Sequence, residues 1–342
     1  MNPVTLIPSF LAAAALAVSS LASAQVIGQL NAPQTVAQAF YQDYSAAFER
    51  QYPQATGVAT HHSNALHSSR EAARVTFNTT TDLQTLADLG VVAPDWAQRL
   101  PSGMAPTRSP VLFVVRPGNP KQIRDWNDLA RADVRVVLVH PKAGAAGRYA
   151  YLGAWGSVRD KGGSDADAAE FVAQLYRNAP QLVRTGREAV AAFGRKGRAD
   201  VLVAFESEVA PLKRQWGAQA VEAVYPSVSI AADNPVALIA HGAEGVAPAG
   251  PAARAYLEFF YSDEAQDIAA RHGIRPRSTS VLARHADVFK PIRLFGIETY
   301  FGNAVQAQQT HFAQGARFDQ FFDQLAGRGS DALLAQAGQR VR

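Results

Sequence analysis

The chain has 342 residues, a net charge of +4 and no cysteine. The lack of cysteine excludes disulfides, thiolate metal sites and cysteine nucleophiles. The fold must therefore be stabilised by burial of a hydrophobic core. A chain of this length with 48% hydrophobic residues can form such a core. The 33 basic residues barely exceed the 29 acidic ones. This excess favours the approach of small anions but is too small for a nucleic-acid-binding surface.

The first 24 residues predict a cleavable signal peptide. An apolar run from Leu11 to Val18 precedes Ala22-Ser23-Ala24, the small-x-small pattern that signal peptidase reads. We expect cleavage after Ala24, although residues 1–24 contain no Lys or Arg. A membrane anchor is the alternative, but a bilayer span needs roughly 20 strongly apolar residues and this run is shorter. With no cysteine to carry a lipid, the chain is expected to be exported and not to be a lipoprotein.

The first clear element of the mature chain is a strand at Val111–Val115, whose five apolar residues predict burial on both faces. A Pro-Gly-Asn-Pro turn at 117–120 follows, and Trp126 and Leu129 then supply the apolar face of a short helix. Further along the chain, strands are predicted at 134–139, 201–205 and 236–240, and helices at 168–177, 187–193 and 254–261.

Ser262 caps a further predicted helix, which Gly273 ends. The alternation of strands and helices predicts α/β layers with parallel strands. The length suggests two lobes, because one compact core rarely grows this large. Residues 326–342 are small and polar and are expected to form a flexible tail.

Several motifs in register resemble the periplasmic sulfate-binding proteins, which deliver anions to ABC importers. The most specific are VVRPGNPKQI at 114–123, DWNDL at 125–129, PK at 141–142 and AWG at 154–156, followed by RPR at 275–277 and HFA at 311–313. The resemblance implies an α/β, two-lobed periplasmic binding protein fold of type II, with the ligand cleft between the lobes. It also implies a monomer in the periplasm that works with an ABC permease of the inner membrane and uses no cofactor or metal.

The same resemblance divides the chain. It implies a first part of lobe 1 at 25–110, lobe 2 at 111–225, and a return to lobe 1 with closing helices at 226–325. In this family the anion is held by neutral donors, chiefly backbone amides at helix N-termini. Carried over residue by residue, the implied site here consists of Thr35, Ser69, Gly144, Ala145, Ala146, Gly186 and Phe205.

Several of these positions depart from the family pattern. The family's Lys-Ser-Ser-Gly-Gly-Ala-Arg is Lys142 to Arg148 here, and it retains the amides but has lost both hydroxyls. At Phe205 the family has tryptophan, so an indole donor is lost. Glu188 introduces a carboxylate two residues after Gly186, where an anion should sit. The lost serine and indole donors correspond to roughly 3 to 6 kcal/mol of sulfate affinity at the usual value for a charge-assisted hydrogen bond.

Three alternatives stay open at this point. The ligand could be a different, larger anion met by Arg74, Arg148 or Arg187, although surface or inter-helix pairing is the ordinary role of such arginines. A metal site or hydrolase could use His61, His62 and His67, but no carboxylate pair completes it and no Gly-x-Ser-x-Gly, Walker or dinucleotide motif occurs. Finally, the fold could have lost its ligand and serve as a regulatory periplasmic protein.

Overall fold

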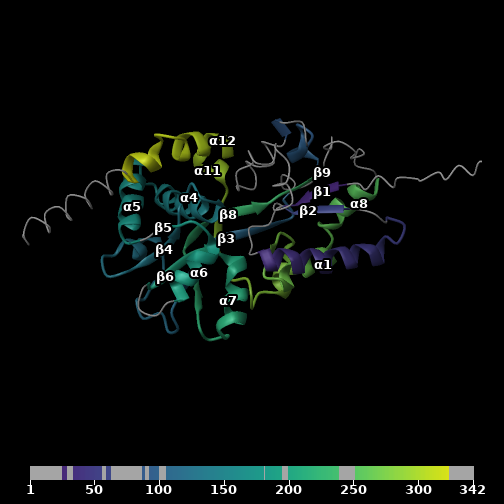
Figure 1. Ribbon diagram of the computed structural model, residues 1–342, viewed down its shortest axis with the longest axis horizontal. Coiled ribbons are helices and arrows are strands. Elements are labelled where there is room, and N and C mark those ends of the chain that lie inside the picture. The colour runs from purple at the N-terminus through teal and green to yellow at the C-terminus, as the bar shows by residue number, and fades with distance from the viewer. Residues whose placement is uncertain are drawn as a thin grey trace, which may run out of the picture.

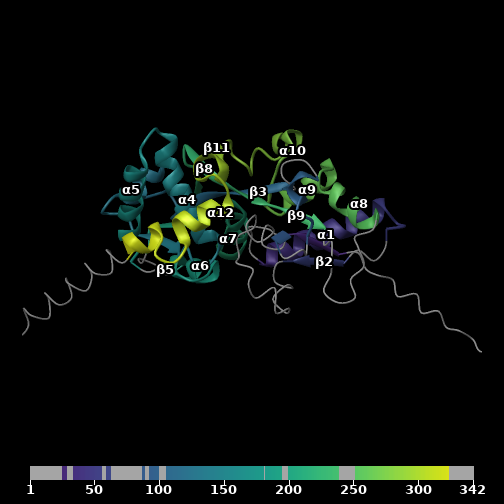
Figure 2. The ribbon, with the colours of Figure 1, turned by 90° about the horizontal axis from the view of Figure 1, so that it is seen from above.

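The computed structural model describes residues 25–28, 34–55, 59–62, 87–88, 92–99, 105–180, 182–194, 199–238 and 251–322. Figure 1 shows two groups of elements joined by β3 and β8. In the second view β3 again lies between the two groups, and β8 lies beside β11 and α4 (Figure 2). The predicted signal peptide and the predicted tail lie outside the described residues. Within these residues, no helix combines the length and the apolar character that crossing a membrane requires.

The larger group is built on an eight-stranded mixed sheet in the order β11-β8-β3-β6-β4-β5, with β7 and β10 also paired to β3. We call this group the second lobe. Its elements up to β8 are β3 (Thr107–Val115), η4 (Trp126–Ala130), β4 (Val136–Val139), α4 (Ala145–Asp160), α5 (Asp165–Arg177), β5 (Leu182–Val183), α6 (Gly186–Gly194), β6 (Val201–Phe205), η5 (Glu206–Glu208), α7 (Val209–Trp216), β7 (Glu222–Val224) and β8 (Val228–Asn234).

The predicted strand at 111–115 forms the central strand of this sheet, and all five of its residues are at most 1% exposed. Val111, Phe113 and Val115 pack with residues of α4 and α5, whereas Val114 packs on the opposite side with residues of α6 and α7. The direction of this strand was predicted wrongly, because β3 is antiparallel to β6, β7, β8 and β10. Its apolar run reflects burial on both faces, and helices can cover both faces of an antiparallel strand as well.

The parallel prediction does hold for other strand pairs, including those that β4 makes with its two neighbours. β4 runs parallel to β5, with Val139 opposite Val183, and also parallel to β6, with Val137 opposite Leu202. The carboxyl ends of β4, β5 and β6 therefore lie at one edge of the sheet. The predicted strand at 201–205 coincides with β6.

The smaller group, the first lobe, contains a three-stranded sheet in the order β2-β1-β9 and its own aromatic core. In this core Tyr44 stacks on Phe260 with ring centroids 4.0 Å apart, and its hydroxyl donates to the carbonyl of Tyr256. The elements are β1 (Gln25–Gly28), α1 (Gln34–Gln51), β2 (Ala59–His62), η3 (Trp96–Gln98), β9 (Val236–Leu238), α8 (Pro251–Phe259), α9 (Asp263–Arg271) and α10 (Thr279–Arg284). Between α9 and α10, β10 (Arg275–Pro276) pairs with β3 of the larger sheet.

The predicted boundaries of α9 are confirmed. The Ser262 side chain accepts from the amide of Ala265 at 3.2 Å, and Gly273 has a φ of +76° just after the helix. The chain then returns to the second lobe, where Phe295, Phe301 and Phe312 join the core with α4 and α5. The closing elements are β11 (Arg293–Phe295), α11 (Ile297–Phe301), α12 (Ala304–Ala307) and the π-helical η6 (Gln308–Phe312).

Candidate functional site

The predicted second-lobe residues share one edge of the sheet. Gly144 is the N-cap of α4, which follows β4. Gly186 begins α6, which follows β5, and Phe205 is the last residue of β6. Because these three strands are parallel neighbours, their carboxyl ends bring all three segments together. Ligands of α/β sheets bind at such an edge.

The start of α4 presents free amides. Gly144 is extended, with a φ of 177°, and no side chain caps the helix. The amides of Lys142 and Ala143 donate to Nδ1 and the carbonyl oxygen of His140, at 3.1 and 2.9 Å. Among the described residues, no acceptor is recorded for the amides of Gly144, Ala145 and Ala146, which lie in a partly exposed segment. Uncapped N–H groups at a helix N-terminus attract anions.

A glycine in the first turn of α4 sets the position of these amides. A Cβ placed on Gly147 would lie 2.6 Å from the carbonyl oxygens of both Val139 and His140. The helix start can therefore pack directly against the end of β4 only because this residue has no side chain. Sequence reasoning missed this role. A glycine inside a helix is a signal, since it costs about 1 kcal/mol relative to alanine.

The start of α6 lies beside an acidic side chain, but not the one expected. Glu188 is exposed and its carboxylate accepts from the amide of Arg184 at 3.0 Å, so it caps its own helix. The carboxylate beside Gly186 belongs instead to Glu208, whose Oε1 would lie 3.2 Å from a Cβ on that glycine. Burial raises the pKa of Glu208 to about 7. Glu208 was missed because only the fold brings η5 next to α6.

Phe205 lies in the core of the second lobe, at the end of β6. The side chain is 4% exposed, and its ring packs edge-on against Tyr149 of α4, with centroids 5.9 Å apart. Ala145 and Ala146 pack against the same core cluster. The Phe205 side chain is therefore a core residue that packs against α4.

Two of the predicted site residues, Thr35 and Ser69, belong to the first part of the chain. Thr35 is the second residue of α1, so its backbone is at a helix N-terminus, as expected. Ser69 lies outside the described residues.

The arginine alternative finds little support in the geometry. Arg148 is 4% exposed, its Nε donates to the carbonyl of Pro141 at 3.2 Å, and its guanidinium lies 5.8 Å from the ring centroid of Phe312. Such contacts are those of a buried arginine that stabilises helix packing. Arg187 is exposed on α6, and Arg74 lies outside the described residues.

The alternative of a histidine site also lacks a complete set of ligands or catalytic groups among the described residues. His61 and His62 belong to β2, where they lie opposite Ile27 and Gly28, and His67 falls outside the described residues. Among the residues that the structure describes, no group of three His, Cys, Asp or Glu side chains is arranged to hold a metal ion.

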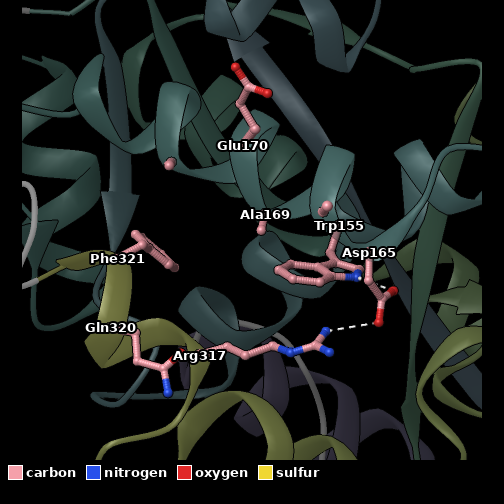
Figure 3. A pocket seen from close by; sticks show the side chains of 9 residues that line it. Trp155, Asp165, Ala169, Glu170, Arg317, Gln320 and Phe321 are labelled. Carbon is pink, nitrogen blue, oxygen red and sulfur yellow. Dashed lines mark hydrogen bonds and ion pairs between the residues drawn. The ribbon is translucent and has the colours of Figure 1, made fainter.

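A pocket of about 500 Å³ opens elsewhere in the second lobe, between α4, α5 and the segment that ends at Phe321 (Figure 3). Arg317 and Asp165 form an ion pair at its edge, with 3.0 Å between Nη1 and Oδ2. None of the predicted site residues lines it. The lining residues are Trp155, Asp165, Ala166, Ala169, Glu170, Ala173, Arg317, Gln320 and Phe321.

Comparisons with known proteins match most of the chain. A family model described as bacterial extracellular solute-binding protein matches residues 30–275, a range that includes every predicted site residue. A thiosulfate-binding protein from Pseudomonas aeruginosa is 40% identical over 304 residues, which cover 86% of this chain and 91% of the relative. A sulfate-binding protein from Salmonella typhimurium is 35% identical over 315 residues, with coverages of 88% and 95%. Among solved structures, a sulfate-binding protein from Mycobacterium tuberculosis matches with a TM-score of 0.68 and 27% identity, covering 84% of this chain and 99% of that one.

Proposed function

Because this chain belongs to the bacterial extracellular solute-binding protein family, we propose that it binds sulfate, thiosulfate or a related oxyanion between its lobes and delivers the anion to an ABC permease. Members of this family are solute-binding proteins and not enzymes. The observation that carries the proposal is the shared carboxyl edge of β4, β5 and β6. There α4 and α6 begin, and within the described part of the chain the amides of Gly144, Ala145 and Ala146 donate to no acceptor.

The chemistry of the site suits a dehydrated anion. Burying a charged group is costly unless its oxygens are hydrogen-bonded. Each charge-assisted bond from a neutral amide contributes about 1.5 to 3 kcal/mol. The helix dipoles of α4 and α6 add to this attraction, because their positive ends point toward the same edge. In this proposal the amides of Gly144 to Ala146 and of Gly186 are the second-lobe donors, and Thr35 and Ser69 supply donors from the first lobe.

Closure of the lobes would follow from the same contacts. The first half of β3 pairs with β8 and β10, where the chain passes between the two lobes, and the second half continues into the second-lobe sheet. An anion held by donors from both lobes stabilises the closed form more than the open form, and only such a difference drives closure. The permease would then recognise the closed form. We also propose that the protein acts as a monomer in the periplasm after cleavage behind Ala24.

Calorimetric titration of the chain from Gln25 onward, freed of bound anion, tests the proposal with sulfate and thiosulfate at neutral pH. Micromolar or tighter binding of either anion supports it. An absence of heat with both anions at millimolar concentration refutes it, and favours a regulatory protein that has lost its ligand.

A charge variant locates the site. Gly144→Asp places a carboxylate at the N-cap of α4, where nothing lies within 4 Å of an added Cβ. Asp is a good N-cap, so the fold should persist while the new carboxylate occupies the amides and repels the ligand. The matched control, Ala166→Asp, makes the same charge change in the exposed first turn of α5. We expect binding to be lost in the first variant and retained in the control, and equal affinity in both would move the site elsewhere.

A further inference from the structure

Three arginines lie where the chain crosses between the lobes. Arg108 on β3 is directly opposite Arg275 on β10 and directly opposite Asp233 on β8. Residues that oppose each other in this way share one face of a sheet, and like charges in opposed positions destabilise the pairing. Arg277, two residues after Arg275, donates from its Nη2 to Oδ1 of Asp233 at 2.5 Å. The crossing strands therefore bring like charges together, and each guanidinium needs a partner.

Two of the three arginines have a carboxylate partner. Arg275 donates to both oxygens of Glu206, at 2.6 and 2.7 Å, and both side chains are buried. The hydroxyl of Tyr225 donates to the same carboxylate at 2.8 Å. Asp233 is bound by the third arginine. Both carboxylates that act on Arg108 are therefore already bound by other groups.

The guanidinium of Arg108 is left without such a partner. Its Nε is buried and has no hydrogen-bond partner in the described part of the chain. Burial, followed by the charges of Arg277 and Arg275, holds the pKa of this guanidinium below its usual value. Buried polar groups are nearly always hydrogen-bonded, and a buried charge without a partner is costly. The rest of the side chain is partly exposed, so an anion from solvent can reach it and remove this cost.

We infer that Arg108 is the centre of an anion subsite on the crossing strands, which takes a small oxyanion such as a carboxylate. A guanidinium presents parallel N–H groups in a planar fork, and two neighbouring oxygens of one anion accept from both. An anion at this place also offsets the repulsion between Arg108 and Arg275, so it stabilises the pairing of β3 with β10. The subsite uses a charged side chain and is separate from the proposed sulfate site, which uses backbone amides.

Thermal unfolding of the chain from Gln25 onward tests the inference, with sodium acetate as the probe and sodium chloride keeping the ionic strength constant. Equal ionic strength screens the arginines equally, so a higher melting temperature in acetate reports binding. We expect acetate to stabilise the wild type over chloride in a saturable way. Equal melting temperatures in the two salts would overturn the inference and leave the proposed function standing.

The variant Gly144→Asp separates the two sites. It blocks the proposed sulfate site, so it should keep the full response to acetate. A loss of this response in Gly144→Asp would place the acetate at the start of α4 and contradict the subsite at Arg108. Conversely, a wild-type chain that binds neither sulfate nor thiosulfate but responds to acetate would refute the proposed function alone.

Substitution of Arg108 distinguishes an anion site from an arginine that only packs. Arg108→Met removes the charge, so the acetate concentration at half-maximal stabilisation should rise at least about tenfold, the equivalent of one charge-assisted bond. In chloride alone this variant should be at least as stable as the wild type, because it removes an unpaired charge opposite Arg275. The matched control, Arg124→Met, makes the same change on an exposed side chain and should respond to acetate as the wild type does. An Arg108→Met protein that is less stable in both salts, with an unchanged response to acetate, would show a packing role and overturn the inference.

Arg108→Lys serves if the methionine variant does not fold. Lysine keeps the positive charge but lacks the planar fork. The lysine variant should fold and bind acetate more weakly than the wild type does. An acetate response equal to that of the wild type would contradict the role of the guanidinium.

Discussion

Replacing Gly147 by alanine should disturb both the stability of the second lobe and the proposed anion site. The added Cβ would lie 2.6 Å from two backbone oxygens, those of Val139 and His140. Ordinary van der Waals contact of a Cβ begins at 3.4 Å, so the start of α4 must move by roughly 0.8 Å away from the end of β4. Backbone cannot rotate out of the way as a side chain does, so the strain falls on the whole first turn.

Overpacking of this kind costs about 1 to 3 kcal/mol, and the better helix propensity of alanine offsets up to about 1 kcal/mol. We therefore expect the free energy of unfolding to fall by about 1 to 2 kcal/mol in urea denaturation. The shift also misaligns the amides of Gly144 to Ala146, so anion affinity should drop about tenfold or more if a single charge-assisted bond is lost. Gly144→Ala is the control for stability, because its Cβ would meet nothing within 4 Å. A Gly147→Ala protein with wild-type stability and affinity would refute the reasoning.

Three further changes follow from contacts in the structure. Arg275 donates to both carboxylate oxygens of Glu206, at 2.6 and 2.7 Å, in a buried ion pair. Arg275→Met breaks this pair, so the free energy of unfolding measured in urea should fall by about 3 to 5 kcal/mol. An unchanged midpoint and slope would contradict this. Glu208 binds its proton more tightly in the folded state, where its pKa is about 7. Its contribution to the free energy of unfolding is therefore fully present below about pH 4.5 and is lost as the pH rises through 7. The loss amounts to up to about 3 kcal/mol. Glu208→Gln should therefore gain stability over the wild type between pH 5 and pH 8, and a difference that stays constant with pH would argue against burial of the carboxyl. Ser262→Ala removes the cap on the amide of Ala265 and should cost about 1 kcal/mol in thermal unfolding; an unaltered melting temperature would show that the cap contributes nothing.

Local patterns predicted the elements of this fold well where burial dominates. The bounds of the strand Val201–Phe205 were predicted correctly. A strand covered on both faces contains no polar residue, whereas the residues that flank it are polar. The start of α9 was predictable because a capping serine acts within its own turn. By contrast, the direction of β3 was not predictable, since its apolar residues report burial and not the direction of the neighbouring strands.

The site was predictable only in part, for a related reason. The helix starts at Gly144 and Gly186 could be placed from the family resemblance, because they follow strands directly in the chain. The acid beside Gly186 could not, since Glu208 comes from a segment 22 residues further along and arrives through the pairing of β4 with β6. Likewise, the need for glycine at position 147 depends on how closely a helix approaches a strand end, which no local pattern records.

The interleaving of the two cores limits how this protein can be recombined. Within the described residues, the chain passes between the cores three times, after Trp96, after Ala232 and after Ile274. A chimera that takes one lobe from this chain and the other from a relative must therefore be joined at three places, near β3, β8 and β10. Each junction interrupts a ladder of strand pairing, so a crossover at any single point leaves both cores with mismatched halves. Substitutions at the proposed site, at the carboxyl ends of β4, β5 and β6, are therefore a more direct way to change the ligand preference than exchange of whole lobes.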